Sequence, residues 1–249
     1  MRGCGGRSNT STGFCPTGNG RMSTKPFYDR NAAFVAEVGD IEDVRRDLET
    51  PGTRYHCVSD QLADPGKLSA AELGFGSINR ARYFASLFGG FEAADISATV
   101  LLDGQDAGFA YRDVNLDEDW PFGDASFDVV LAMMVFEHLF DPFHSFAELS
   151  RVLKPTGTAF VNLPNIGSIR CRWDILRGRL PMTSTADWFE LRQWDGGHLH
   201  YFTIDEVRRI AALNGLRIRK IYPVGGQLWL KKLWPGLFCH EISYVFEKA

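Results

Sequence analysis

The sequence predicts an α/β protein with a doubly wound, mostly parallel sheet. Stretches typical of strands alternate with helical stretches from Lys67 onward. The run from Phe127 to Met133 is apolar apart from Asp128, as expected of a parallel strand buried on both faces. A glycine turn, Gly74-Phe75-Gly76, joins one predicted strand to the helix that follows it. The 249 residues, of which 45% are apolar, suffice for one large domain with a small lid.

Two helix starts are particularly well marked. Asp141-Pro142 combines an acceptor cap with proline at the first helical position. Thr203 and Glu206 have the spacing of a capping box, and Gly215 is a stop signal for that helix. Pro155 and Gly157 are expected to close the earlier helix. We expect strands at 67–73, 91–96, 108–113, 127–133, 158–163, 216–223 and 241–247, and helices at 77–87, 98–102, 142–153 and 204–214.

The chain divides into three parts of different composition. Residues 1–22 are rich in Gly, Ser, Thr, Asn and Arg, which predicts a disordered tail. Residues 23–66 carry apolar residues at helical spacing, which predicts an N-terminal helical cap. Residues 67–249 form the main domain, in which the Arg- and Trp-rich segment 164–200 is expected to be an irregular lid insertion.

Charge and cysteine usage narrow the classes of function. The 27 basic and 31 acidic residues give a net charge of −4, which argues against a nucleic-acid partner. The longest apolar run, Val129 to Phe136, has eight residues, whereas a transmembrane helix needs about twenty. The five cysteines are scattered and contain no C-x-x-C pair, so neither a zinc clip nor a disulfide framework is expected. We therefore predict a reduced, cytoplasmic protein.

Acidic residues follow or end three consecutive predicted strands. Glu72 lies in the glycine turn region, Asp95 ends the second strand and Asp113 ends the third. Carboxyl ends of neighbouring parallel strands line one crevice, and a carboxylate there can accept both ribose hydroxyls of a nucleoside cofactor. The glycine turn alone is equally compatible with a tight strand-to-helix connection that binds nothing.

A longer segment resembles a known family. Phe127-Asp128-Val129-Val130 leads to Glu137-His138-Leu139, and Glu148-x-x-Arg151-Val152-Leu153-Lys154-Pro155 follows. This resembles the class I S-adenosylmethionine-dependent methyltransferases with a type 11/23 domain. The later pattern N-x-P-N, R-x-R, G-R-x-P and H-x-H-x-x-T looks like the MetW-like branch. The resemblance implies a Rossmann-like fold, S-adenosylmethionine as cofactor and methyl transfer to a small-molecule acceptor.

The resemblance also implies roles for individual residues. Glu72, Gly74 and Gly76 would border the methionine part of the cofactor, with Glu72 near its amino group. Asp95 would bind the ribose. The adenine would lie beside Ile96, Asp113 and Val114, while Ala132 and Met133 follow the fourth strand and Met133 would pack against the cofactor.

The chain departs from the family pattern at three places. Phe75 is bulky where the family has a small residue, Ile78 and Asn79 stand where the third glycine belongs, and only 17 residues separate Asp95 from Asp113. A catalytically degenerate partner or regulatory protein on the same fold is therefore the alternative. A nicotinamide dehydrogenase would share the glycine turn, but the missing third glycine and the segment from 127 to 155 disfavour it.

Three histidines are candidates for a catalytic base toward an acceptor hydroxyl: His138, His198 and His200. Such an acceptor would be a sugar, lipid-linked or quinone-like compound. The competing interpretations are that Glu137-His138 caps a loop and that His198 or His200 hydrogen-bonds across the base of the lid. The His-x-His pair lacks a convincing third ligand, so no metal site is predicted.

Two surface segments have open interpretations. The lid arginines are expected to form a solvated cationic face, with binding of an acceptor phosphate or carboxylate as the alternative. The segment Trp229-Leu230-Lys231-Lys232-Leu233-Trp234 is expected to pack on the sheet edge or in a homodimer contact, with peripheral membrane contact as the alternative. The arginines concerned are Arg170, Arg172, Arg177 and Arg179.

Overall fold

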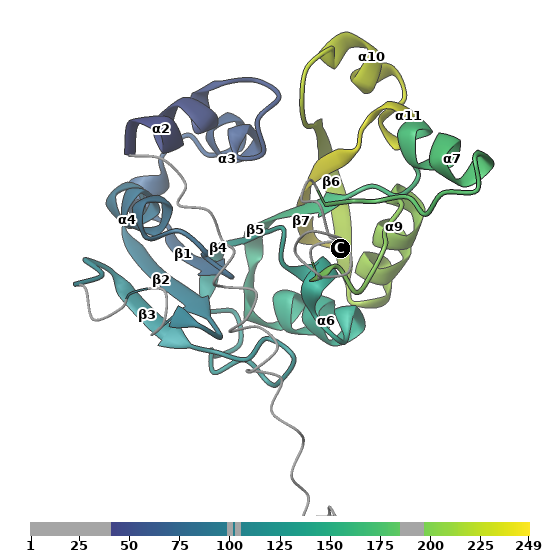
Figure 1. Ribbon diagram of the computed structural model, residues 1–249. Coiled ribbons are helices and arrows are strands. Elements are labelled where there is room, and N and C mark those ends of the chain that lie inside the picture. The colour runs from purple at the N-terminus through teal and green to yellow at the C-terminus, as the bar shows by residue number, and fades with distance from the viewer. Residues whose placement is uncertain (1–40, 99–101, 103–105, 185–196) are drawn as a thin grey trace, which may run out of the picture.

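The computed structural model describes residues 41–98, 102, 106–184 and 197–249. Its seven strands form one sheet of order β3-β2-β1-β4-β5-β7-β6 (Figure 1). The first five strands in this order are parallel, while β7 runs antiparallel to both β5 and β6. The strands are β1 (Ser69–Leu73), β2 (Gly90–Asp95), β3 (Ala110–Asp113), β4 (Phe127–Met133), β5 (Leu153–Pro164), β6 (Leu216–Pro223) and β7 (Glu241–Lys248).

Helices lie on both faces of the sheet, so the predicted doubly wound, Rossmann-like α/β class is confirmed. The helices are α2 (Ile41–Glu49), α3 (His56–Gln61), α4 (Ile78–Leu87), α6 (Pro142–Val152), α7 (Ile169–Leu176), α9 (Ile204–Leu213), α10 (Leu228–Leu233) and α11 (Pro235–Phe238). Two single 3-10 turns, η1 (Pro65–Lys67) and η2 (Phe136–His138), complete the described elements.

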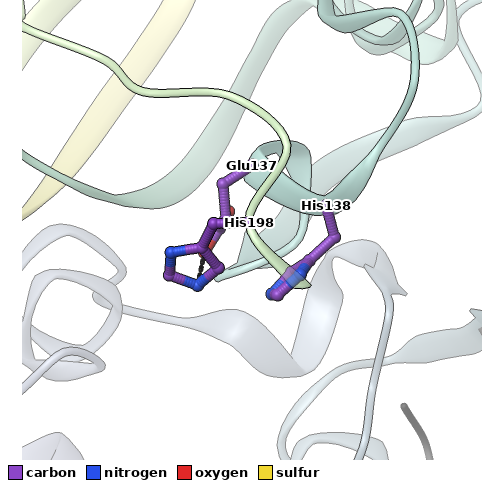
Figure 2. A group of neighbouring side chains, drawn as sticks. All are labelled: Glu137, His138 and His198. Atoms are coloured by element: carbon purple, nitrogen blue, oxygen red, sulfur yellow. Dashed lines mark ion pairs between the residues drawn. The ribbon is translucent and has the colours of Figure 1, made fainter. Parts of the chain in front are cut away.

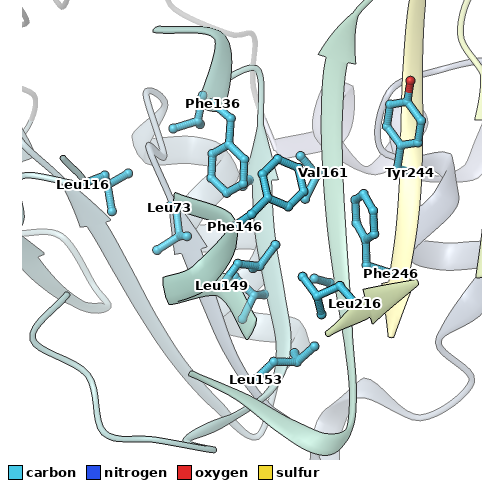
Figure 3. Close-up of a cluster of buried hydrophobic side chains, with 14 of the residues drawn as sticks. Leu73, Leu116, Phe136, Phe146, Leu149, Leu153, Val161, Leu216, Tyr244 and Phe246 are labelled. Carbon is cyan, nitrogen blue, oxygen red and sulfur yellow. The ribbon is translucent and has the colours of Figure 1, made fainter. Parts of the chain in front are cut away.

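The core has two halves because successive residues of a strand point to opposite faces. In one half, α6 and α9 pack against the sheet. Figure 3 shows Phe146 and Leu149 of α6 within this cluster of buried side chains. The other half packs α2, α3 and α4 against the opposite face. Strand β4 serves both, with Val130 and Ala132 in the first half and Met133 in the second.

The helix starts follow the sequence signals with one difference. The Asp141 carboxylate accepts hydrogen bonds from the backbone N–H groups of Phe143 (2.9 Å) and His144 (3.1 Å), as a cap should. At α9 the Thr203 hydroxyl instead bonds the Glu206 carboxylate, so it does not cap the backbone. The stop at Gly215 is confirmed by its left-handed φ of +68°.

Several expectations need correction. The segment Lys154–Gly157 belongs to β5, where the pairing register with β4 shifts, and is not a break between helix and strand. The segment 164–200, expected to be irregular, contains helix α7, capped by Ser168. The sequence shows no apolar periodicity over α7, because among the residues of this helix only Cys171 is buried. The expected tail at 1–22 and most of the helix at 98–102 lie outside the described residues.

Candidate cofactor and acceptor site

The glycine turn after β1 is held tightly against the end of β4. Gly74 and Gly76 have left-handed φ values of +64° and +54°, which favour glycine. A Cβ atom at Gly74 would lie 2.6 Å from Cγ2 of Val135. Phe75, the bulky departure from the family pattern, is fully buried and packs edge to face on Phe109, with ring centroids 5.7 Å apart. The core therefore accommodates its side chain.

The three acidic residues lie on adjacent strands, as predicted. Asp95 and Asp113 are register partners at the carboxyl ends of β2 and β3, and Glu72 lies near the end of neighbouring β1. Asp95 Oδ1 accepts a hydrogen bond from the backbone N–H of Ser97 at 2.9 Å, which fixes its carboxylate beside Ile96. Val114 continues from Asp113 and is buried.

The residues that end β4 are differently placed. Ala132 is fully buried, and Met133 belongs to the hydrophobic cluster that faces α3 and α4. The next residue, Met134, has a φ of +59°, an uncommon conformation for a side chain of this size. Its backbone N–H donates to the Asn162 carbonyl at 3.0 Å. Such conformations cluster at functional sites, and they leave no signal in the sequence.

Glu72 forms a buried ion pair with Arg80 of α4. The Arg80 Nε atom lies 2.9 Å from Glu72 Oε1. The other oxygen, Oε2, is buried and has no hydrogen-bond partner among the described residues. Burial raises the pKa of Glu72 to about 7, and the positive charge of Arg80 opposes that rise. Arg80 also donates to the Phe75 carbonyl and lies 5.1 Å from the centre of the Tyr55 ring.

Sequence reasoning missed Arg80 and Tyr55. Arg80 lies in the first turn of α4. Since the start of that helix was predicted, the proximity of Arg80 to the glycine turn could have been predicted from the sequence. Tyr55 precedes α3 in the N-terminal cap, and only the tertiary fold brings it to the site.

These groups fit S-adenosylmethionine. Oε2 of Glu72 has no hydrogen-bond partner in the described parts of the chain and is therefore available as an acceptor for an ammonium group. The turn at Gly74 and Gly76 exposes backbone without side-chain bulk, and the Asp95 carboxylate suits ribose hydroxyls. The residues that would hold the cofactor are thus gathered at one edge of the sheet.

A second group of polar residues follows β4 directly, in η2. Figure 2 shows the side chains of Glu137, His138 and His198 clustered together. Glu137 is fully buried, and neither carboxylate oxygen has a hydrogen bond within the part of the chain that is described. Burial raises its pKa to about 8. One ligand-type atom from each of the three residues lies within 4.8 Å of the others.

The segment around His198 is tied to η2 by backbone and side-chain bonds. The N–H groups of Leu199 and His200 donate to the Glu137 carbonyl at 2.7 and 3.1 Å. His198 Nδ1 is 2.6 Å from Thr183 Oγ1, so His198 forms a hydrogen bond within the segment 164–200. The rings of His138 and His198 have centroids 4.7 Å apart.

The three candidate histidines therefore separate into a pair and a single residue. His138 and His198 are neighbours, whereas His200 Nε2 lies 3.2 Å from the Phe140 carbonyl and outside the group with Glu137. Glu137 is the member that sequence reasoning treated only as part of a loop cap. The Glu-His dipeptide after the buried strand was the available signal.

The surface formed by α7 and α10 exposes large apolar and basic side chains. We call it the α7/α10 surface: Ile169, Trp173, Ile175, Leu176, Leu180, Trp229, Leu233 and Trp234, with Arg170, Arg172, Arg177, Arg179 and Lys232. Helix α10 contacts the edge strand β6, but the side chains of Trp229 and Leu233 are 74% and 76% exposed and do not pack there, so a homodimer contact for them stays a prediction. The Arg177 guanidinium stacks 4.8 Å from the Trp173 ring centre. Figure 1 places α7, α10 and α11 on the same side of the molecule.

None of the helices in the described residues has the length and apolar character needed to cross a membrane.

Residues 71–161 match the family model described as a methyltransferase domain. No curated protein matches the chain in the sequence search.

Solved structures with the same fold are numerous, and three illustrate them. An S-adenosylmethionine-dependent methyltransferase from Mesorhizobium loti is 14% identical, with a TM-score of 0.57, covering 81% of this chain and 100% of that one. Phosphoethanolamine N-methyltransferase 2 from Haemonchus contortus, solved with S-adenosylhomocysteine, is 15% identical, with a TM-score of 0.58, covering 92% and 60%. A chain from the complex between the Haloferax volcanii Trm112 activator and a methyltransferase is 15% identical, with a TM-score of 0.58, covering 88% and 97%.

Residues 71–161 of this chain thus match a methyltransferase domain, and the chain has the Rossmann-like methyltransferase fold. At these identities the solved structures establish the fold alone.

Proposed function

We propose that this protein is an S-adenosylmethionine-dependent methyltransferase acting on an oxygen of a small-molecule acceptor. The carrying observation is the set of three carboxylates at adjacent strand ends beside the glycine turn, with Glu72 Oε2 left without a partner in the described chain. The match of residues 71–161 to the methyltransferase domain supports it. The MetW-like resemblance belongs to this proposal as well, carried by the lid pattern.

In this proposal the chain's residues bind and align, because methyl transfer from a sulfonium is an in-line displacement. Bound S-adenosylmethionine would supply the activated methyl group. Glu72 accepts from the ammonium, Asp95 from the ribose hydroxyls, and Ile96 and Val114 flank the adenine together with Asp113. Holding cofactor and acceptor in line is itself worth a large rate factor. His138, next to the end of β4, is placed to take the proton of an acceptor hydroxyl.

The test is calorimetry with S-adenosylmethionine and S-adenosylhomocysteine. Asp95→Ala removes charge-assisted hydrogen bonds worth about 1.5–3 kcal/mol, so affinity should fall roughly 10- to 150-fold. The matched control is Asp205→Ala, because Asp205 is an exposed carboxylate in the first turn of α9. Absence of binding to the wild type at millimolar ligand would refute the proposal, and an unchanged affinity of Asp95→Ala would refute the ribose assignment.

A catalytically degenerate partner or regulatory protein is the second candidate. One observation favours it: Arg80 already occupies Glu72 Oε1, which lowers the net negative charge available to the cofactor ammonium. A stable stoichiometric partner in a pull-down, together with bound cofactor that is never turned over, would establish this role. A dehydrogenase is tested by mixing with reduced nicotinamide cofactor, where enhanced fluorescence would support it.

We also propose that the α7/α10 surface contacts an anionic membrane surface. Exposed Trp, Leu and Ile side chains interleaved with arginines and Lys232 are the composition of an interfacial site. This suits a lipid-linked acceptor. Self-association through the same surface, as in a homodimer, is the competing outcome and would show as a concentration-dependent mass. The buried thiols of Cys57, Cys171 and Cys239 form no disulfide within the described part of the chain, which supports a reducing, cytoplasmic location.

A further inference from the structure

The buried carboxylate of Glu137 requires a positive partner if it is ionised. An ionised carboxylate taken out of water costs many kcal/mol unless it is paired or coordinates a metal. Arg54 is near enough to act electrostatically on Glu137, but its guanidinium is bonded to Glu241 by two hydrogen bonds of 2.6 and 3.1 Å. Neither Glu137 oxygen accepts a hydrogen bond from a described residue. The side chain is therefore buried and oriented without a local bond that explains its orientation.

The groups that face this carboxylate are the two histidines, and their other nitrogens are already engaged. His138 Nδ1 lies 3.2 Å from the Gly197 carbonyl, which accepts a hydrogen bond only if Nδ1 carries the proton. His198 Nδ1 lies 2.6 Å from the Thr183 hydroxyl. The Thr183 hydroxyl can accept a hydrogen bond from a protonated Nδ1 of His198, and in that tautomer Nε2 of each ring keeps its lone pair. Histidines that bind metals are typically held by such a hydrogen bond at the second nitrogen.

We propose that Glu137, His138 and His198 form a binding site for a divalent metal ion, with Zn²⁺ as the favoured ion. Two imidazoles and one carboxylate are a ligand set that binds Zn²⁺ and leaves positions open for water or substrate. The site differs from the His198-x-His200 pair of the sequence, since His200 bonds Phe140 instead.

The ligand spacing suits an ion with a modest contraction. His198 Nε2 is 4.0 Å from Glu137 Oε1, and all three ligand atoms lie within 4.8 Å of one another. Metal–ligand bonds of about 2.0–2.1 Å place tetrahedral ligand atoms about 3.3 Å apart. The side chains must therefore approach one another by roughly 1 Å. The backbone is already fixed, because Leu199 and His200 donate to the Glu137 carbonyl.

The site deepens the proposed function, on which the following role rests. With His138 bound to the ion, the ion would replace His138 as the group that activates the acceptor: a hydroxyl bound at an open position of the ion would be acidified, and its proton would pass to solvent. The oxygen lone pair then forms the bond to the methyl carbon, while the carbon–sulfur bond breaks and its electron pair stays on sulfur. The turn at Gly74 packs on Val135, two residues before Glu137, so the ion would lie at the cofactor's edge of the sheet.

The experiment measures binding of Zn²⁺ and Co²⁺ to the metal-stripped full chain, with no cofactor present. We expect one ion per chain and visible Co²⁺ absorption bands typical of nitrogen and oxygen ligands. His198→Ala and Glu137→Gln should each weaken binding by a factor on the order of 100. Thr183→Val, which removes only the hydroxyl that orients His198, should weaken it by about 10- to 100-fold.

The matched controls are His144→Ala and His200→Ala, which should keep wild-type affinity. His144 is a half-buried histidine whose Nε2 lies 2.9 Å from the Glu118 carbonyl. Unaltered binding in both Glu137→Gln and His198→Ala, or loss of binding in His200→Ala alone, would overturn the assignment. Circular dichroism checks that each variant folds. If one of the ligand variants does not fold, His138→Ala takes its place, because His138 is only half-buried.

Failure of this site and failure of the proposed function are distinguishable. Calorimetry with S-adenosylhomocysteine reports the cofactor site of the metal-stripped protein, and Co²⁺ absorption reports the metal site. Cofactor binding without any metal binding overturns the metal site alone.

Discussion

Substituting Gly74 by alanine tests the packing that joins the glycine turn to the end of β4. Gly74 has a φ of +64°, and the added Cβ would lie 2.6 Å from Cγ2 and 3.2 Å from Cγ1 of Val135. Two penalties follow from these values. The left-handed backbone disfavours alanine by about 1–2 kcal/mol, and the forced contact adds about 1–3 kcal/mol of overpacking.

Gly215→Ala separates the two penalties. Gly215 has nearly the same φ, +68°, but its added Cβ would meet nothing within 4 Å. We expect Gly215→Ala to lower the free energy of unfolding by about 1 kcal/mol, since a smaller unfolded-state entropy offsets part of the backbone strain. Gly74→Ala should lower it by about 2–4 kcal/mol.

Urea unfolding of both variants measures these values, and a double-mutant cycle locates the contact. Val135→Ala removes both clashing methyl groups, so Gly74→Ala should cost less in that background, with a coupling energy of about 1–3 kcal/mol. Calorimetry should show weaker S-adenosylhomocysteine binding for Gly74→Ala and unchanged binding for Gly215→Ala. Equal stability losses in the two glycine variants, or zero coupling, would refute the packing argument.

Three further predictions concern a buried charge, a side-chain clamp and the surface. Burial raises the pKa of Glu72 to about 7 from its ordinary 4.5, so this group stabilises the fold fully below about pH 4.5, and that contribution is lost as the pH rises through 7. Urea unfolding of the wild type should show this decline relative to Glu72→Gln. Parallel curves of unfolding free energy against pH for the two proteins would contradict it. Arg151 donates to the carbonyls of residues 120 and 122 and to the carboxylates of residues 124 and 148, so Arg151→Met should lower the free energy of unfolding by about 2–4 kcal/mol. Arg208 forms an exposed ion pair with Asp205, so Arg208→Met should be nearly neutral. Equal effects of the two substitutions in urea unfolding would be evidence against the clamp. Trp229→Ser should reduce co-sedimentation with phosphatidylserine vesicles several-fold, while Leu213→Ser, an equally exposed position on α9, should not. High salt should weaken wild-type binding, because it screens the basic side chains from the anionic lipid. Similar losses in both variants would contradict the membrane proposal.

Local signals in the sequence were sufficient for most of the parallel core. The run at Phe127–Met133 gave the bounds of β4, because a strand buried on both faces is apolar along most of its length, and Asp128 near its start is the one exception. Asp141-Pro142 gave the start of α6 because cap and proline act within one turn. The order of acids along the chain placed Asp95 opposite Asp113, since parallel strands align their carboxyl ends.

Features that depend on contacts distant in sequence were missed. Helix α7 was overlooked because it buries little against the protein, so its apolar positions follow no inward stripe. Trp229 was expected on the sheet edge, since apolar character alone does not tell a core contact from an exposed one.

By itself, therefore, the sequence determined the fold class, the glycine turn and the row of carboxylates at the strand ends. These rest on period, turn chemistry and strand direction, which act over a few residues. Only the tertiary structure decided that Arg80 pairs with Glu72, that Tyr55 reaches the same site, and that His198 rather than His200 joins Glu137 and His138. The physical reason is that burial and pairing of charged groups are set by which distant segments meet, and His138 and its partner Gly197 are 59 positions apart in the sequence.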